Sequence, residues 1–386
     1  MVNTVNVMRK VYLLFTLLFF LACNKDADLE SNVSFDILGT YNVSTKIAID
    51  TVTFSSLIDK EYKLRIPFCE CTNEGTIIVG ADIREEIISD QTAISIGIVR
   101  STDGGDTFSD PQIIIPHSFL SDWDRAMDGT ILVDRVNGRI WVFAHRIYSH
   151  TVWETTHKMG DYGFDCVFVY SDDDGRSWSK PESLRNRLQI NGASVVSMFG
   201  GVGHGITMKG GTLVLPIQCK MAVDEDSTCY NIQSRIMYSC DRGNTWKSES
   251  LVPCYSSEGM VVELDDGELM INCKSYISRR RVFVTCDMGK SWLPHETDQL
   301  LIEPNACQGS LHKIDKWGFF LNPMNEKTRS NLTLQITDDF VNWNPIIELY
   351  PEQCKGYTCL CNDGNMLYAV SETMGGVIMF YKIYHL

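Results

Sequence analysis

Short runs in which apolar and polar residues alternate follow one another along most of the chain. Two examples are CVFVYS at residues 166–171 and RVFVTC at residues 281–286. A period of two is typical of β-strands, and clusters of Gly, Asn, Asp and Ser, which favour turns, separate the runs. Helical periodicity is scarce after the N-terminal segment. The pattern therefore predicts an all-β protein.

One turn sequence recurs along the chain, with the pattern Ser/Thr-x-Asp-x-Gly-x-Ser/Thr-aromatic. The copies are STDGGDTF at 101–108, SDDDGRSW at 171–178, SCDRGNTW at 239–246 and TCDMGKSW at 285–292, with a worn copy, TDDFVNW, at 337–343. An aspartate accepts hydrogen bonds from the backbone N–H groups that follow it, and glycine supplies a positive φ. Each copy therefore predicts the turn of a β-hairpin.

The acidic residues of these copies do not suit a calcium loop. An EF-hand loop needs a bidentate Glu at its twelfth position, and with Gly175 at the sixth position the twelfth is Pro181. A structural role is favoured instead. Hairpins that recur about every 45–70 residues are typical of a β-propeller with insertions in some blades. A body of about 340 residues divides into six blades of about 57 residues.

The N-terminal segment has the features of a secretory signal. Arg9 and Lys10 precede an apolar run, residues 11–22, which is too short to span a bilayer. The sequence FLAC, which ends at Cys23, resembles a bacterial lipobox, so we expect Cys23 to be lipidated and the protein to be exported to the periplasm or cell surface. The predicted divisions are a signal peptide at 1–23, a polar tether at 24–45 and the propeller domain at 46–386.

The composition limits the partners of this protein. The net charge is −15, which argues against nucleic acid and against a membrane contact other than the lipid anchor. Thirteen cysteines follow Cys23, among them two C-x-C pairs, Cys69/Cys71 and Cys359/Cys361. No set of cysteines has the spacing of a zinc site, and we expect neither a metal nor a cofactor. Most cysteines are expected to be buried in strands, and the sequence leaves their pairing open.

Five segments outside the repeated turns hold charged or phenolic side chains in apolar surroundings. They are YKLRIPF with Arg65, IREEIISDQ with Arg84 and Asp90, SSEGMVVELDDGELMINCKSY with Glu258 and Lys274, EKTRSNLTLQI with Arg329, and CKGYTCLCNDG with Tyr357. With the RIP motif at Arg65 and the repeated turns, these segments resemble the bacterial exo-sialidases (neuraminidases) over about residues 45–386. The resemblance implies a six-bladed β-propeller whose hairpin turns are Asp-boxes, also called BNR repeats.

The resemblance also implies a role for each side chain of a sialic acid site. The implied catalytic residues are Asp90 as the general acid/base, Glu258 as the base and Tyr357 as the nucleophile. The implied substrate-binding residues are Arg65 and Arg329 as the first and last arginines of a carboxylate-binding triad, Lys274 at the middle position of that triad, Arg84 in the pocket wall, and Asp128 beside the C4/N5 side of the sugar.

Lys274 is the point at which the chain departs from the family, which has an arginine there. A lysine keeps the positive charge but lacks the planar fork of a guanidinium. Arg279, Arg280 and Arg281 follow closely, so a shifted loop could supply the missing guanidinium. We favour direct contact between Lys274 and the substrate carboxylate, because the offset from Glu258 then needs no shifted loop.

The residue types suit the chemistry of sialic acid. This sugar carries a carboxylate on its anomeric carbon, so a carboxylate nucleophile would meet like-charge repulsion there. A neutral phenol avoids the repulsion if a nearby base removes its proton in the transition state. Arginine forks bind a carboxylate through charge-assisted hydrogen bonds. A protonated Asp90 would assist the leaving group and then take a proton from water.

The expected function is retaining hydrolysis of terminal α-linked sialic acid through a tyrosyl–glycosyl intermediate. The expected partners are sialylated glycoproteins, glycolipids or oligosaccharides. Two alternatives stay open. The altered triad is consistent with a related 2-ulosonic acid, such as a deaminated sialic acid or Kdo. A non-catalytic sialoglycan-binding propeller is the other, although a binding protein has no use for Asp90, Glu258 and Tyr357 together.

Overall fold

The structure is a computed structural model that describes most of the chain after residue 32. The residues described are 33–35, 39–49, 62–85, 88–117, 125–147, 164–191, 195–221, 231–304 and 306–385. The predicted signal peptide, with its lipidation residue Cys23, lies outside them. Twenty-eight strands and two short 3-10 helices are found in the described part, which makes the protein all-β as the alternating pattern predicted.

The strands form five hydrogen-bonded sheets. The first contains β1 (Val33–Phe35), β2 (Gly39–Ile49), β28 (Ile378–His385), β27 (Met366–Glu372) and β26 (Thr358–Asn362), in that order. The second contains β3 (Tyr62–Cys71), β4 (Ile77–Glu85), β5 (Ile94–Ser101), β6 (Gln112–Ile115), β7 (Arg125–Val133), β8 (Ile140–Ile147), β9 (Phe164–Ser171) and β10 (Glu182–Ser183), with β13 (Gly203–His204) on β7.

The other three sheets follow in chain order. The third contains β11 (Leu188–Ile190), β12 (Val195–Gly200), β14 (Ile206–Thr207), β15 (Leu213–Met221), β16 (Asn231–Ser239) and β17 (Trp246–Ser248). The fourth contains β18 (Ser257–Glu263), β19 (Leu269–Lys274), β20 (Arg281–Thr285) and β21 (Leu293–Pro294), and the fifth β22 (Ser310–Ile314), β23 (Trp317–Pro323), β24 (Leu332–Thr337) and β25 (Asn344–Tyr350). The 3-10 helices are η2 (Leu184–Asn186) and η3 (Asp265–Gly267).

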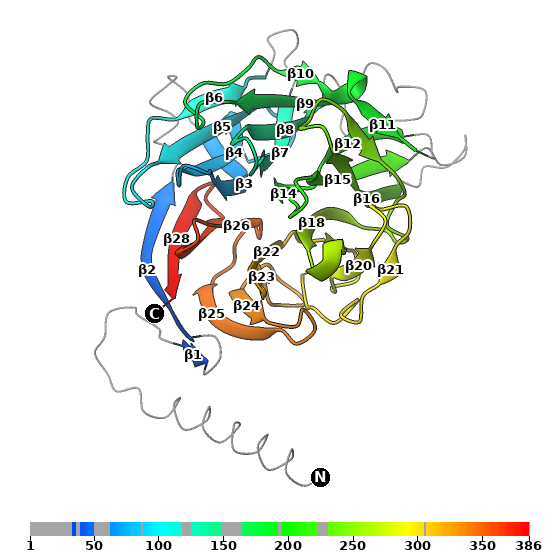
Figure 1. Ribbon diagram of the computed structural model, residues 1–386. Coiled ribbons are helices and arrows are strands. Elements are labelled where there is room, and N and C mark those ends of the chain that lie inside the picture. The colour runs from blue at the N-terminus through cyan, green and yellow to red at the C-terminus, as the bar shows by residue number, and fades with distance from the viewer. Residues whose placement is uncertain are drawn as a thin grey trace, which may run out of the picture. The chain divides into compact units, whose positions relative to one another are not determined.

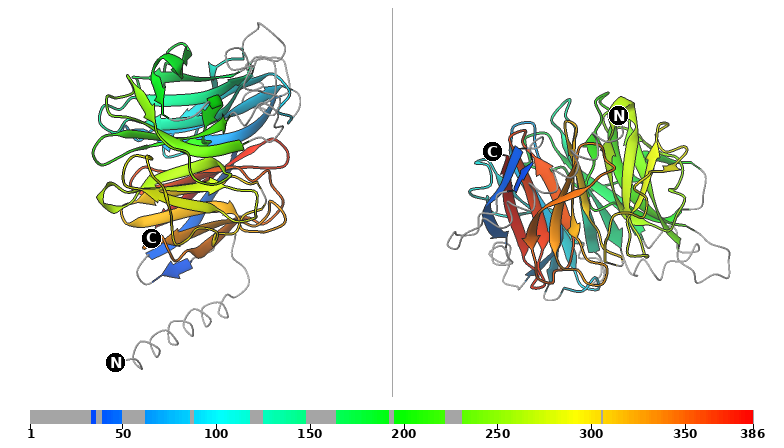
Figure 2. Two further views of the ribbon diagram at one scale, coloured as in Figure 1. Left: turned by 90° about the vertical axis from the view of Figure 1, so that its right-hand side faces the viewer. Right: turned by 90° about the horizontal axis from the view of Figure 1, so that it is seen from below.

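The sheets follow one another around a ring, which gives the fold a propeller-like arrangement (Figure 1; side views in Figure 2). Strands near the middle of the ring pack against each other: β3 against β7 and β26, and β22 against β18 and β26. The nine-stranded sheet contains two hairpin groups, β3–β6 and β7–β10, which a single parallel pair between Ile94 and Arg125 joins.

The ring closes where the two ends of the chain meet in one sheet. β2 pairs antiparallel with β28 from Ile49 opposite Ile378 to Tyr41 opposite His385. The predicted tether boundary at residue 45 is therefore too late, because residues 39–45 are already strand. The physical reason is that the edge of β28 has unpaired N–H and C=O groups, which β2 satisfies.

Each repeated turn is held by its aspartate. At residues 171–178, Asp173 Oδ1 accepts from the backbone N–H of Ser177 at 2.8 Å, and Asp173 Oδ2 accepts from the Ser177 hydroxyl at 2.6 Å. The Ser171 hydroxyl donates to Asp173 and accepts from the N–H of Gly175, whose φ is 77°. The other three full copies form the same set of hydrogen bonds. Their carboxylate oxygens are thus occupied by the turn itself.

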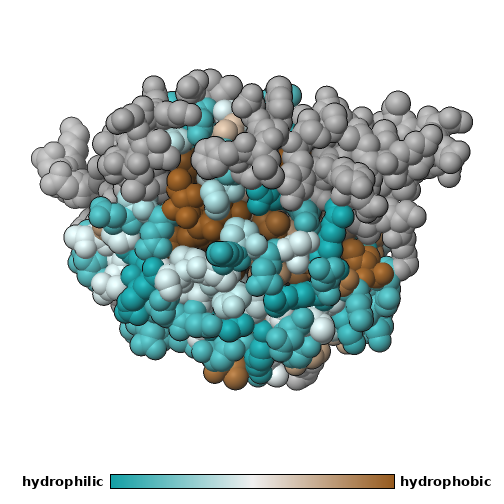
Figure 3. All heavy atoms as spheres, turned by 90° about the horizontal axis from the view of Figure 1, so that it is seen from above, coloured by the Kyte–Doolittle hydropathy of each residue, from teal (hydrophilic) through white to brown (hydrophobic). Residues whose placement is uncertain are grey.

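Apolar side chains fill the spaces between the sheets. Separate clusters of buried residues lie between neighbouring groups of strands, one of them between β3, β4 and the strands β26–β28. Polar residues cover most of the described surface in the view of Figure 3, with apolar residues showing in patches among them. Within the described ranges, no helix has the length and apolar character needed to cross a membrane.

Candidate active site

Tyr357 and Glu258 form the centre of the candidate site. Tyr357 precedes β26 and is 7% exposed, and its hydroxyl donates to Glu258 Oε1 at 2.7 Å. Lys274 Nζ, from the end of β19, lies 2.5 Å from the same oxygen. The other carboxylate oxygen, Oε2, is buried without a hydrogen-bond partner. One oxygen of Glu258 therefore contacts both the phenol and a cation.

Three cations surround the Tyr357 ring. The guanidinium carbons of Arg65 and Arg329 lie 5.4 Å and 5.8 Å from the ring centroid, and Lys274 Nζ lies 5.9 Å from it. Arg329 is held by two backbone carbonyls, with Nη1 donating to Lys355 and Nη2 to Ala306. The chain has a strongly negative net charge, yet this site gathers positive charge that suits an anionic ligand.

Glu372, at the end of β27, holds the first of these arginines. Arg65 Nε donates to Glu372 Oε1 at 2.8 Å, and the backbone N–H of Ile66 donates to the same oxygen at 2.6 Å. The backbone N–H of Tyr357 donates to Oε2 at 3.2 Å. The Glu372 side chain is 1% exposed, so these bonds are what compensate its buried charge.

Asp82 connects a second group of side chains. Its Oδ2 accepts from Arg84 Nη2 at 3.0 Å, and its Oδ1 accepts from the backbone N–H of Asp128 at 3.0 Å. Arg84 Nη1 reaches Asp90 Oδ1 at 2.5 Å. The Asp90 side chain is 66% exposed, whereas those of Asp82 and Arg84 are fully buried. Asp90 is thus the member of this group that solvent and a ligand can reach.

Burial raises the pKa of three groups at the site. Burial, and then the Glu258 carboxylate, raises the pKa of Tyr357 well above its ordinary value, so the phenol is neutral until a base takes its proton. Burial, and then the charges of Asp82 and Glu258, raises the pKa of Asp128 well above its ordinary value. Burial raises the pKa of Asp82 to about 7, although Arg84 opposes the shift.

Six residues around the site have positive φ, each in or just before a strand near the middle of the ring. They are Ile66 (54°), Asp128 (60°), Val202 (68°), Glu258 (42°), Ala306 (56°) and Gly356 (94°), and Gly203 (100°), directly after Val202, also has positive φ. Gly356 also needs its missing side chain, because a Cβ there would lie 2.6 Å from Cys307 Sγ and 3.0 Å from Arg329 Cδ. The backbone therefore turns in the same way at corresponding places around the ring.

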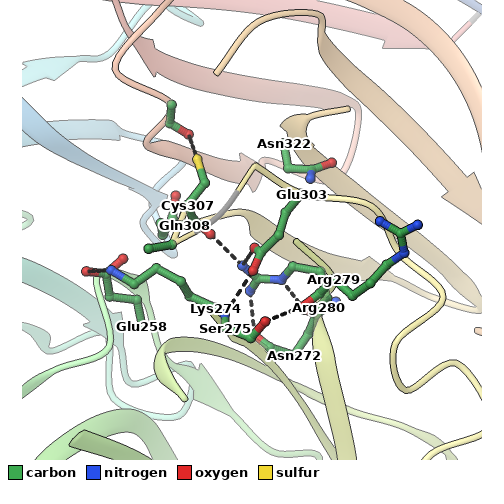
Figure 4. Close-up of polar contacts among 12 residues, drawn as sticks. Glu258, Asn272, Lys274, Ser275, Arg279, Arg280, Glu303, Cys307, Gln308 and Asn322 are labelled. Atoms are coloured by element: carbon green, nitrogen blue, oxygen red, sulfur yellow. Dashed lines mark hydrogen bonds and ion pairs between the residues drawn. The ribbon is translucent and has the colours of Figure 1, made fainter. Parts of the chain in front are cut away.

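The three arginines that follow Lys274 have other partners, and Figure 4 shows those of Arg280. Arg280 is fully buried and donates to Glu303, to Asn272 and to the Cys307 carbonyl. Arg279 pairs with Glu326, and Arg281 pairs with Asp298 at 2.8 Å. Among the described cations of this segment, Lys274 is the one that contacts Glu258. The contacts therefore favour Lys274 over a shifted loop.

The structure brings the eight sequence-predicted site residues into one region. Arg65, Glu258, Lys274, Arg329 and Tyr357 are in direct contact, and Arg84, Asp90 and Asp128 gather around Asp82. Arg65 lies opposite Asp82 in the β3–β4 pair, which joins the two groups. The sequence reasoning missed Asp82 and Glu372. The available signal was an acidic residue in an otherwise apolar strand, in VGADIRE and MLYAVSE.

The described residues contain no group of three or more His, Cys, Asp or Glu side chains arranged to hold a metal ion. The chemistry that the site offers is that of a phenol beside a carboxylate, with guanidinium and ammonium groups for an anion.

Comparisons with known proteins show that the chain is similar to sialidases over most of its length. A family model described as a BNR repeat-like domain matches residues 70–342. A sialidase of Bacteroides fragilis is 31% identical, over 78% of this chain and 58% of the relative. A sialidase of Paraclostridium sordellii is 32% identical, over 78% of this chain and 80% of the relative. The solved structure of the Hadza microbial sialidase Hz136 superposes with a TM-score of 0.76 at 28% identity, covering 84% of this chain and 66% of that one.

The partners of Arg280 predict a structural role for this arginine. Arg280→Met would leave the Glu303 carboxylate buried without its cation, and burial already raises the pKa of Glu303. We expect the free energy of unfolding, measured in urea, to fall by about 3–5 kcal/mol. Arg279→Met is the control and should cost less than about 1 kcal/mol, because its partner Glu326 is half exposed. Equal stability of the two variants would contradict the assignment.

Proposed function

The chain belongs to the sialidase family, and we propose that it is a glycoside hydrolase that releases terminal α-linked sialic acid from glycoconjugates. The observation that carries the proposal is the 2.7 Å hydrogen bond between the Tyr357 hydroxyl and Glu258, inside a ring of three cations. A neutral phenol, a base to activate it and cations to hold a carboxylate are what hydrolysis of a 2-carboxylated sugar requires.

In the proposed mechanism, Tyr357 Oη attacks the anomeric carbon while its proton passes to Glu258. Asp90 gives a proton to the departing glycosidic oxygen, and the Tyr357–sugar bond forms as the bond to the leaving group breaks. Asp90 then takes a proton from water, which displaces Tyr357 Oη as that oxygen regains its proton from Glu258. Two displacements at one carbon give retention of configuration. The raised pKa of Tyr357 supports the need for Glu258 as the base.

The substrate carboxylate would bind between Arg65, Arg329 and Lys274. Glu372 accepts from the Arg65 guanidinium, and the carbonyls of Ala306 and Lys355 accept from that of Arg329, so both guanidinium groups are held in place. An ammonium has three N–H donors, so Lys274 can contact Glu258 and still donate to a ligand. We assign Arg84 to the pocket wall and Asp128, held through its backbone by Asp82, to the polar groups of the sugar.

We also propose that the ring has six blades and that the repeated turns are Asp-boxes. Counting the two hairpin groups of the nine-stranded sheet separately, together with the other four sheets, gives six groups. Positive φ at a corresponding place in every one of the six groups supports this count. The hydrogen bonds of Asp173 and its counterparts support the identification of the turns.

Export, lipidation at Cys23 and a place in the periplasm or at the cell surface remain part of the proposal. The proposed substrates are sialylated glycoproteins, glycolipids or oligosaccharides. A second candidate is hydrolysis of a related 2-ulosonic acid, and the observation that favours it is the lysine at position 274 in a site otherwise built from arginines.

The proposal is tested by offering the full chain a panel of fluorogenic 2-ulosonides. The panel contains glycosides of N-acetylneuraminic acid, deaminated sialic acid and Kdo, and the rate of fluorophore release is measured. Release from the N-acetylneuraminic glycoside supports sialidase activity, and release from another glycoside alone selects the second candidate. The absence of turnover from every glycoside, with binding retained on a glycan array, would identify a binding protein instead.

Tyr357→Phe tests the nucleophile. The ring still fills its place, so we expect ligand affinity to stay near the wild-type value while kcat falls by far more than tenfold, because the covalent route is lost. Steady-state kinetics and equilibrium binding separate the two effects. The control is Tyr368→Phe, which removes a hydroxyl that donates to Asp363 and should leave kcat unchanged. A Tyr357→Phe enzyme with more than about a tenth of wild-type kcat would exclude this nucleophile.

Lys274→Met tests the cation at the middle position. We expect kcat/KM to fall at least about tenfold, since roughly 1.5–3 kcal/mol of charge-assisted bonding is lost. Lys274→Arg should be tolerated or should lower KM. Arg279→Met and Arg281→Met are matched controls that remove nearby positive charge, and both should have nearly wild-type kinetics. A silent Lys274→Met, with damage from one of these controls, would refute the assignment.

A further inference from the structure

Four buried cysteines meet where the first and last strands near the middle of the ring come together. Cys69 and Cys71 are two positions apart on β3 and so share a face of the strand, and the same holds for Cys359 and Cys361 on β26. Each is at most 1% exposed, and all four belong to one apolar cluster that includes Tyr368. The two C-x-C pairs of the sequence, which are 290 positions apart, therefore face each other in space.

The contact between β3 and β26, here called the seam, brings several thiols together: Cys361 interacts with both Cys69 and Cys71, and Cys69 also interacts with Cys359. Cys71 Sγ lies 3.7 Å from Cys361 Sγ, whereas Cys359 Sγ points to the carbonyl of Cys69 at 3.5 Å. The backbone of Cys71 is fixed, because its N–H donates to Glu70 Oε1 at 2.9 Å and its carbonyl accepts from Arg135 at 2.6 Å. Two buried sulfurs in van der Waals contact on neighbouring strands are close enough to be candidates for a disulfide.

Side chains, and no backbone ladder, join the two strands that carry these thiols. β3 is at one end of the nine-stranded sheet, and β26 is at one end of the five-stranded sheet, with no backbone ladder between them. β2 and β28 close the ring by hydrogen bonds elsewhere in the five-stranded sheet. A covalent bond between β3 and β26 would therefore add a second closure of a different kind.

We infer that Cys71 and Cys361 form a disulfide that closes the ring covalently when the chain reacts with an oxidant of the disulfide class, RS–SR. The Cys71 thiolate attacks the donor RS–SR, which gives a mixed disulfide and releases one RS⁻. The Cys361 thiolate then attacks the Cys71 sulfur and releases the second RS⁻. Two electrons pass from the cysteines to the donor, and the two thiol protons end on two RSH molecules.

The surroundings of the thiols determine when this exchange occurs. The hydrogen bond with Cys361, and then burial, raises the pKa of Cys71, and burial raises that of Cys361. Thiolates are therefore scarce in the closed ring, so the bond forms before the seam closes or when it opens locally. The finished disulfide is buried and shielded from reductants. It encloses a very long loop, for which the stabilisation by a crosslink is largest.

The test compares the full chain after unfolding and refolding with oxidised glutathione and after the same treatment with a non-thiol reductant. Free thiols are blocked by alkylation, and peptides are mapped by mass spectrometry without reduction. We expect a peptide that joins Cys71 to Cys361 in the oxidised sample only. We also expect the thermal unfolding midpoint of the protein in the oxidised sample to lie at least about 5 °C above that of the protein in the reduced sample.

Serine variants test whether the crosslinked peptide and the higher unfolding midpoint have the same origin. Cys71→Ser and Cys361→Ser should each remove the crosslink and the difference between the two midpoints. Cys166→Ser, which alters a buried cysteine of a different apolar cluster, should leave both unchanged. The map of the wild-type chain decides the matter even if a variant fails to fold. Alkylation of both Cys71 and Cys361 in the oxidised sample, or a crosslink from either one to another cysteine, would overturn the inference.

Discussion

The buried carboxylate of Glu372 is the interaction on which the candidate site depends. It binds the Arg65 guanidinium and the backbone N–H groups of Ile66 and Tyr357, so it ties β27 both to β3 and to the residue before β26. β3 begins the ring and β26 begins its last group of strands. The Glu372 side chain thus fixes the position of the Arg65 cation relative to the proposed nucleophile, Tyr357, where β3 meets β26. Removing one partner of such a buried pair leaves a charge without compensation.

The seam therefore carries two features on the same two strands. The residues Arg65 and Tyr357 lie at one end of β3 and β26, and Cys71 and Cys361 lie at the other. Opening of the seam would separate the cation from the phenol as well as the thiols from each other. Closure of the ring and the geometry of the site therefore depend on the same side-chain contacts between β3 and β26, because no backbone ladder links these strands.

The sequence predicts the strands and their turns well because both depend on local patterns. Alternation in CVFVYS corresponds to β9, and Asp173 makes the local hydrogen bonds that its spacing from Ser177 predicts. The site is different, since Glu258 and Tyr357 are 99 positions apart and only the resemblance to a family connected them. Asp82 and Glu372 escaped attention because the backbone N–H groups that they accept from, those of Asp128 and Ile66, are far away in the sequence. The tether boundary failed because the pairing of β2 depends on β28, at the far end of the chain.

Asp82 and Glu372, which the sequence reasoning missed, have the same structural role: each accepts a hydrogen bond from a bulge in a neighbouring strand. Bulges in β3, β7 and β18 lie at Ile66, Asp128 and Glu258, where positive φ takes the backbone out of the regular ladder. Such a conformation costs on the order of 1–3 kcal/mol, and it leaves a buried N–H that needs a new acceptor.

A side-chain oxygen from a neighbouring strand accepts each of these three N–H groups. Glu372 accepts from Ile66 at 2.6 Å, Asp82 from Asp128 at 3.0 Å and Gln218 from Glu258 at 3.3 Å. The bulge turns a site residue out of the ladder, and the acceptor holds the turned backbone in place. Buried polar residues in these apolar strands therefore stabilise the strained backbone at the bulges. A search of such a sequence for site residues should include those that hold the backbone as well as those that face the ligand.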